Sequence, residues 1–144
     1  MSTTTIERIL LDFKKEHNIY LSKVPRKKII YDGRVKNSSS IVVVMPASKI
    51  YPRGNGWVDF TKIQIDVFKE YKIAIVIFRL SDGTNYFIDM NALFPLFTKE
   101  NMIVNDREGE HWKMDIWKNK IVLRNGGKTL YVVPNEKEWI SKVL

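Results

Sequence analysis

Few side chains in this sequence of 144 residues have the types and the spacing that catalysis or metal binding requires. There is no cysteine, which excludes thiolate nucleophiles, disulfides and cysteine-ligated metal centres. Only two histidines are present, which argues against a site built from several histidines. One of them, His111, follows Glu108 and Glu110 in an acidic stretch. As metal ligands these three are incomplete, and we interpret them as a solvated turn.

The common motifs of nucleotide binding and hydrolysis are missing. The chain has no P-loop, no Gly-x-Gly-x-x-Gly, no Gly-x-Ser-x-Gly and no His-Glu-x-x-His. Metal chemistry would therefore depend on carboxylates, because a hard cation such as Mg²⁺ takes oxygen ligands.

Positive charge is concentrated in one stretch. The sequence has 24 Lys and Arg against 16 Asp and Glu, a net charge of +8. Residues 23–53 hold eight cations and a single acid, whereas the part from Ile73 onward has ten basic and nine acidic residues. A solubilising excess would be spread evenly, so we interpret the stretch as a surface for a polyanion, above all nucleic acid. The alternatives are solvated turns whose lysines protect sheet edges, and a surface for an anionic membrane or an acidic protein.

Residues 49–57 mix cations, aromatic rings and glycines, which makes them the best candidate for a binding loop. Cations contact phosphates, and an exposed Tyr51 or Trp57 could stack on an unpaired base, although both rings could instead anchor the loop to the core. No base-reading helix can be identified, so we expect recognition through the backbone or shape. The predicted nucleic-acid-binding residues are Lys27, Lys28, Arg34, Lys36, Lys49, Arg53, Tyr51 and Trp57.

Two helices are predicted by the spacing of a capping box. Thr4 and Glu7 precede an apolar stripe at helical spacing, so the first helix should end near His17. Thr61 and Gln64 begin a second helix, whose broad apolar face should include Ile63 and Val67.

Apolar runs predict the strands. Two runs, 40–45 and 73–80, are apolar on both faces, which is typical of central strands in a sheet covered on both sides. Asp-Gly at 82–83 predicts a hairpin, and residues 50–56 are expected to form a loop. The other expected elements are strands at 19–24, 28–35 and 85–88, a short helix at 90–97, a meander at 111–117, 120–124 and 128–133, and a helix near 139–143.

The predicted order α-β-β-β-α-β over residues 4–80 resembles the core of the restriction-endonuclease-like, PD-(D/E)xK nuclease superfamily, in its archaeal Holliday-junction-resolvase branch. The resemblance implies that Glu7 and Asp32 bind Mg²⁺ or Mn²⁺. It also implies catalytic roles for both of these acids, for Lys49 as the lysine of the Glu-x-Lys motif, and for Gln64 as a supporting residue.

One departure from that family shifts the expectation from cleavage to binding. Where the family has Glu-x-Lys, this chain reads Val44-Met45-Pro46-Ala47-Ser48-Lys49, so the carboxylate is missing. Two acids alone are a weak site for a hard cation. We expect a nucleic-acid-binding protein on a nuclease-like scaffold with a degenerate metal site. The alternatives are an active Mg- or Mn-dependent nuclease and a small protein-interaction module that uses the aromatic meander.

For the whole chain we predict a single α/β (α+β) domain over residues 1–144, with a central mixed sheet flanked by helices. Its core should span about 4–80, followed by a C-terminal meander and helix at about 81–144. No apolar run approaches the roughly 20 residues of a bilayer span, and no signal peptide is evident. We therefore expect a cytoplasmic protein with no membrane partner. DNA is favoured over RNA, and a homodimer is left open.

Overall fold

Two strands that are buried on both faces lie at the centre of the first sheet. In the computed structural model, which describes residues 2–36 and 38–144, β3 and β6 pair in parallel, with Val42 opposite Ala74. β2 pairs antiparallel with β3, and β7 pairs antiparallel with β6. The strands of this mixed sheet are β1 (Ser22–Lys23), β2 (Ile30–Arg34), β3 (Ser40–Val44), β4 (Ala47–Ser48), β6 (Ile73–Leu80) and β7 (Asn85–Asp89).

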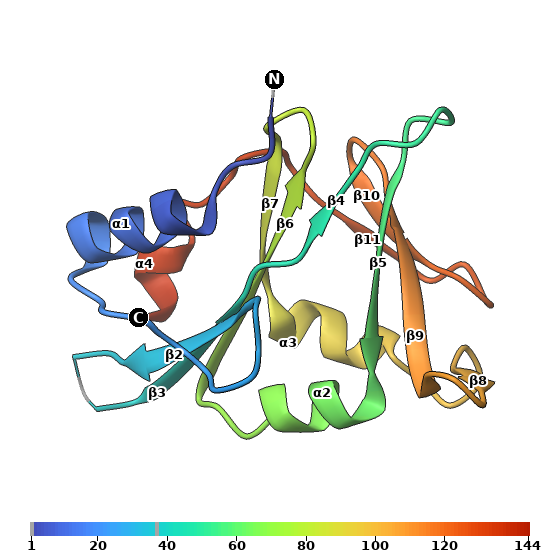
Figure 1. Cartoon of the computed structure of the whole chain (residues 1–144), viewed down its shortest axis with the longest axis horizontal. Helices are drawn as coiled ribbons and strands as arrows, with labels where there is room; N and C mark the ends of the chain where they lie inside the picture. Colours follow the sequence, from blue (N-terminus) through green and yellow to red (C-terminus); the bar gives the residue numbers. More distant parts are fainter. Residues whose placement is uncertain (1, 37) are drawn as a thin grey trace.

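The second sheet is antiparallel and begins in the chain segment that crosses from β3 to β6. β5 pairs with β9 along its whole length, from Gly56 opposite Ile116 to Thr61 opposite His111. Figure 1 shows this sheet beside the first one, with β4 leading into it. Its strands are β5 (Gly56–Thr61), β8 (Ile103–Asn105), β9 (Gly109–Ile116), β10 (Lys120–Leu123) and β11 (Thr129–Tyr131).

Helices lie on both sides of the first sheet. The first helix begins after Thr5, whose hydroxyl accepts a hydrogen bond from the Arg8 amide, and ends at Asn18 in the left-handed conformation. No helix in the described residues has the length and apolar character that crossing a membrane requires. The helices are α1 (Ile6–His17), α2 (Lys62–Phe68), α3 (Met90–Leu93), the 3-10 turn η1 (Phe94–Leu96) and α4 (Ile140–Val143).

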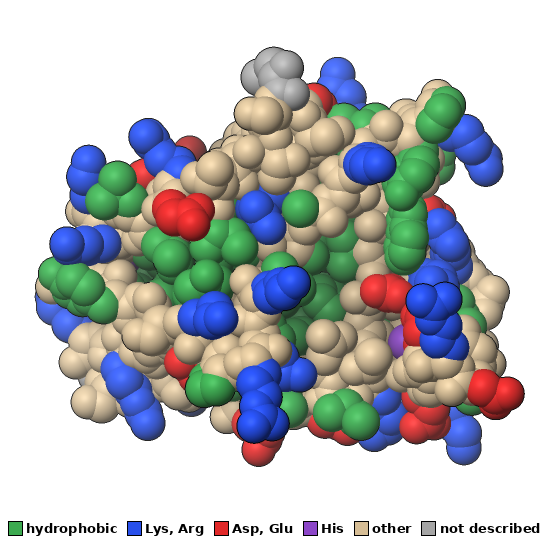
Figure 2. Space-filling model, viewed as in Figure 1, with side chains coloured by type: hydrophobic (Ala, Val, Ile, Leu, Met, Phe, Trp, Pro, Cys, Tyr) green, Lys and Arg blue, Asp and Glu red, His purple; other side chains and the backbone are tan. Residues whose placement is uncertain are grey.

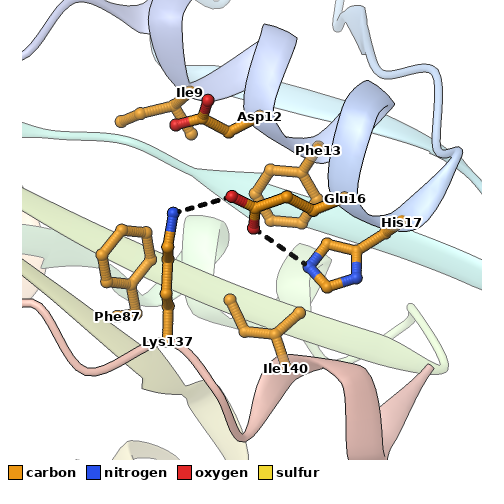
Figure 3. Close-up of a pocket in the computed structure, with 8 residues that line it drawn as sticks. All are labelled: Ile9, Asp12, Phe13, Glu16, His17, Phe87, Lys137 and Ile140. Carbon is orange, nitrogen blue, oxygen red and sulfur yellow. Dashed lines mark hydrogen bonds and ion pairs between the residues drawn. The ribbon is translucent and has the colours of Figure 1, made fainter.

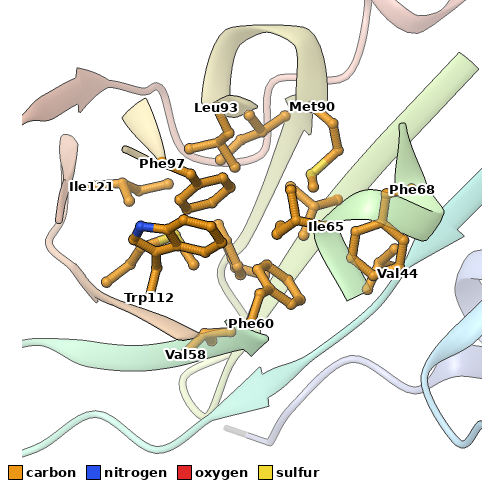
Figure 4. Close-up of a cluster of buried hydrophobic side chains, with 14 of the residues drawn as sticks. Val44, Val58, Phe60, Ile65, Phe68, Met90, Leu93, Phe97, Trp112 and Ile121 are labelled. Carbon is orange, nitrogen blue, oxygen red and sulfur yellow. The ribbon is translucent and has the colours of Figure 1, made fainter. Parts of the chain in front are cut away.

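Alternation along the central strands builds two cores. Val43 and Ile75 face the core under α1 and α4, whereas Val42 and Val76 face the core shared with α2, α3 and the second sheet. Figure 4 shows this second core. Trp112 of β9 is buried there together with Met114 and Ile116. These three side chains therefore serve core packing, whereas Tyr131 of β11 is exposed.

The predicted fold class is confirmed: the chain is an α+β domain with a central mixed sheet flanked by helices. The core has two strands more than predicted: β4 and β5 stand between β3 and α2, where the sequence predicts a loop at 50–56 and no strand. Burial alternates along β5, with Val58 and Phe60 buried and Trp57 and Asp59 partly exposed. This pattern is typical of a strand covered on one face, and the flanking glycines obscured it.

Both capping predictions can be compared with the structure. The second is confirmed, since Thr61 and Gln64 form a complete capping box. The first is wrong by one residue: Thr5 caps the helix, whereas the hydroxyl of Thr4 accepts a hydrogen bond from the Asn85 side-chain amide, at 3.1 Å. The apolar face of α2 is also narrower than predicted: Ile63 is 77 % exposed.

Truncation of Phe68 should destabilise the protein strongly. Its ring is fully buried and packs edge to face on Phe60, with 5.6 Å between ring centroids. We expect Phe68→Ala to lower the free energy of unfolding by about 3–5 kcal/mol in urea denaturation. Ile63→Ala on the same helix is the control and should change it by no more than about 0.5 kcal/mol. Equal effects of the two substitutions would contradict this packing.

Candidate functional site

A groove of about 720 Å³ lies where the chain crosses from the first sheet to the second. It is lined by the β3–β5 connection, β5, the start of α2 and the turn before β9. In Figure 2, hydrophobic side chains are visible in a hollow in the middle of the molecule, with Lys and Arg side chains around it. The lining residues are Ile29, Pro46, Ala47, Ser48, Lys49, Tyr51, Trp57, Val58, Asp59, Thr61, Gln64, Arg107 and Glu108.

The two aromatic rings predicted to bind bases differ in their surroundings. Tyr51 is 40 % exposed and lines the groove. Trp57 is partly buried, and its ring is contacted by two cations: Lys113 Nζ lies 4.7 Å and Arg124 Cζ 5.7 Å from the centroid. Tyr51 is therefore the ring with the freer surface for stacking, whereas Trp57 is packed into the second sheet.

Hydrogen bonds hold the loop between β4 and β5 in place. The Ser48 hydroxyl accepts from the Trp57 amide at 2.9 Å, and the Asn55 side-chain amide donates to Asp115 at 3.1 Å. Asp115 in turn accepts two hydrogen bonds from Arg124, at 2.9 and 3.1 Å. These bonds fasten the backbone of the loop to both sheets.

Gln64 lines the groove but has a structural task. Its side-chain oxygen accepts a hydrogen bond from the backbone amide of Thr61 at 2.9 Å. The backbone amide of Gln64 donates to the Thr61 hydroxyl at 3.1 Å. These two bonds satisfy orphan donors at the start of α2 and set the angle between β5 and the helix.

The two carboxylates of the predicted metal site are not brought together. Asp32 lies on β2 and accepts a hydrogen bond from the Tyr71 hydroxyl at 2.7 Å. Like Ile30, two residues earlier, it faces the core shared by the two sheets. Glu7 is on α1, which covers the opposite face of the same sheet. Neither acid is among the residues that line the groove with Lys49.

The eight cations of residues 23–53 are all exposed, but they divide between two ends of the first sheet. Lys28 precedes Ile29, which lines the groove, and Lys49 and Arg53 belong to the loop beside it. Arg34 lies opposite Ser40, at the far end of the β2–β3 hairpin from the groove. Across the groove, exposed Arg107 adds a cation that the sequence interpretation missed.

The register of the second sheet assembles a cluster of chemically active side chains at the groove. Asp59 lies directly opposite Lys113 and diagonally from His111, on the same face. Glu108 reaches this face from the turn before β9. The ligand atoms of Asp59, Glu108 and His111 all lie within 4.8 Å of one another. Glu110 faces the other side of β9, where it lines a different pocket with Trp112.

The interpretation of this turn as solvated is wrong for His111, which is fully buried. Its Nδ1 lies 2.9 Å from the carbonyl oxygen of Gly109, and because a carbonyl only accepts, Nδ1 must carry a hydrogen. Its Nε2 lies 3.3 Å from Glu108 Oε2 but has no hydrogen-bond partner in the described residues. Lys113 Nζ stands nearby, 3.5 Å from Asp59 and 3.9 Å from Glu108.

The second histidine has different surroundings (Figure 3). His17 lies 3.9 Å from Glu16, whose carboxylate also accepts from Lys137 at 3.0 Å. The cavity beside them has a volume of only about 20 Å³, room for about one water molecule, and Phe13 lines it. We assign this cluster to the packing of α1 against α4.

In three comparisons with known proteins, no protein-family model, no curated protein and no solved structure matched this chain. The resemblance to PD-(D/E)xK nucleases therefore stays a prediction.

The contact between Tyr71 and Asp32 predicts a pH dependence. Burial, and then the hydrogen bond to Asp32, raise the pKa of Tyr71 from 10.0 to about 12. Because the folded protein holds this proton more tightly than the unfolded chain, its contribution to stability is complete below pH 10 and is lost toward pH 12. Urea denaturation should show that the free energy of unfolding falls more steeply between pH 10 and pH 12 in the wild type than in Tyr71→Phe. Tyr131→Phe, at an exposed position, should follow the wild type; identical curves for all three would contradict the assignment.

Proposed function

We propose that the protein binds nucleic acid through the groove and the cations around it. The observation that carries this proposal is that the exposed cations of residues 23–53, among them Lys49 and Arg53 at the groove, form no ion pair with any described acid. The Lys and Arg residues that do form ion pairs all lie outside this segment. They are Arg8, Lys62, Lys113, Arg124 and Lys137.

Unpaired surface cations of one sign repel one another, which a fold tolerates at little cost only while they are well hydrated. A phosphate backbone would turn this repulsion into attraction and release condensed counterions. The segment supplies cations on one side of the groove, through Lys28 and Lys49, while Arg107 supplies one from the other. This arrangement supports contact with a strand that runs along the groove.

The proposed contact is with the backbone and with unpaired bases rather than with a base sequence. The exposed cations of residues 23–53 lie on strands and loops, and no helix of the described chain presents a row of cations toward the groove. Tyr51 offers a π-face to one base, because every base can stack on an aromatic ring. Cleavage is not proposed, since Glu7 and Asp32 lie on opposite faces of the first sheet.

Charge reversal near the groove should weaken binding. We expect the triple variant Lys27→Glu, Lys28→Glu, Arg53→Glu to bind a duplex or a single strand more weakly at moderate salt. The slope of log affinity against log salt should become shallower by about 3, because three phosphate contacts are lost. Fluorescence anisotropy at several salt concentrations measures both quantities.

The matched control changes the net charge equally at another place. The control replaces three exposed lysines outside the basic segment, Lys118, Lys128 and Lys142, by Glu. This triple variant should keep most of the wild-type affinity and of the wild-type salt slope. Binding of the first variant as tightly as the wild type would refute the assignment. Equal losses in both variants would show that total charge matters and this surface does not.

Stacking on Tyr51 predicts a preference that charge alone does not. Tyr51→Ala should weaken binding of a single strand by about 1–3 kcal/mol and leave duplex binding nearly unchanged. Tyr131→Ala, on an exposed ring of β11, is the control and should have no effect on either. The same anisotropy titrations measure both affinities. An equal loss of affinity for the single strand and for the duplex would mean that Tyr51 does not stack on bases.

A further inference from the structure

A buried imidazole nitrogen without a hydrogen-bond partner faces two carboxylates at the edge of the groove. The three ligand atoms, from Asp59, Glu108 and His111, lie within 4.8 Å of one another. His111 is shielded from solvent, and its Nε2 has no hydrogen-bond partner in residues 2–36 and 38–144. We infer that this cluster binds a divalent transition-metal ion, and that zinc fits it best.

The hydrogen bonding of the ring prepares Nε2 as a ligand. Nδ1 donates its hydrogen to the Gly109 carbonyl, so in the neutral ring Nε2 carries a lone pair. That lone pair faces Glu108 Oε2 at 3.3 Å, which is repulsive unless a positive charge lies between them. Donation of the other ring nitrogen to a backbone carbonyl is typical of metal-binding histidines. A proton on Nε2 is the competing source of positive charge.

The chemistry of the donors selects the metal. One imidazole nitrogen and two carboxylate oxygens are ligands that zinc accepts, whereas magnesium prefers oxygen alone and keeps most of its water. Three protein ligands leave a fourth tetrahedral position for water. Because Asp59 and Glu108 line the groove, this position would face it.

The site needs only a small adjustment to close on an ion. Two donors at about 2.1 Å from one ion can be at most about 4.2 Å apart, against the 4.8 Å limit of this cluster. The side chains of Asp59 and Glu108 are 38 % and 35 % exposed, so both can rotate inward. His111 is held by its bond to Gly109 and serves as the fixed ligand.

Lys113 occupies the position of a competing cation. Its ammonium lies 3.5 Å from Asp59 and 3.9 Å from Glu108, the two carboxylates that the metal would use. It also lies over the Trp57 ring, which offers it a place when the carboxylates turn toward an ion. Removing this ammonium should therefore tighten metal binding, because it ends the competition.

Isothermal titration of the full chain with ZnCl₂, in the absence of nucleic acid, tests the inference. The wild type should bind one zinc ion per chain, and Mg²⁺ at the same concentration should not compete. His111→Gln, Asp59→Asn and Glu108→Gln should each weaken zinc binding by more than about tenfold. The two acid variants keep the test valid if His111→Gln does not fold, because both acids are partly exposed.

His17→Gln is the matched control, since His17 is also beside a glutamate but outside the cluster. It should bind zinc as the wild type does, and Lys113→Met should bind it more tightly. No zinc binding by the wild type would overturn the inference. So would unchanged affinity in all three ligand variants, unchanged affinity in Lys113→Met, or equal competition by Mg²⁺. A negative result would leave the proposed nucleic-acid binding unaffected, because the titration contains none.

Discussion

Parallel pairing of β3 with β6 is the constraint on which the rest of the structure depends. Both strands are buried on both faces, so each must lie inside a covered sheet, and there they are neighbours. Parallel neighbours cannot be joined by a tight turn, and the chain must cross over between them. Here the crossover, residues 45–72, contains β4, β5 and α2.

The crossover does more than connect two strands. β4 pairs with β6 in the first sheet, and β5 then pairs with β9 in the second sheet, while α2 and the shared core hold the two sheets together. The groove lies where this segment passes from one sheet to the other. The loop that carries Lys49 and Tyr51, and the strand that carries Asp59, therefore reach the groove through the same topological requirement.

The groove carries side chains of both charge signs. Cations without ion pairs surround it, whereas Asp59 and Glu108 place negative charge at one edge, balanced in part by Lys113. Two carboxylates beside a phosphate backbone would oppose binding. A divalent ion held by these acids would reverse the local sign, so the inferred metal site and the proposed function are electrostatically compatible.

Continuous apolar runs made the central strands predictable from the sequence, because a strand covered on both faces must be apolar throughout. The capping box of Thr61 and Gln64 and the hairpin at Asp82-Gly83 were equally local signals. The predictions that failed concerned the tertiary structure. Spacing along the chain does not say which face of a sheet a side chain takes, so the prediction of a shared metal site for Glu7 and Asp32 was wrong.

The cluster around His111 could not be predicted from the sequence for the same reason. Asp59 and Glu108 are far apart in the sequence, and only the register of β5 on β9 brings them together. The alternation Val58-Asp59-Phe60 was the one local signal for β5, and no strand was predicted there beside the glycine-rich loop at 50–56. Once β5 is known, strand pairing alone places Asp59 diagonally from His111.

The central claim is that the groove made by the crossover is where nucleic acid binds. An NMR titration of ¹⁵N-labelled protein with a short single-stranded DNA, at low salt, tests it most directly. The account predicts that the largest amide shifts occur around the groove, at Lys49, Tyr51 and Arg107, and that α1 and α4 are hardly affected. Shifts confined to the face covered by α1 and α4, or no shifts at all, would contradict it.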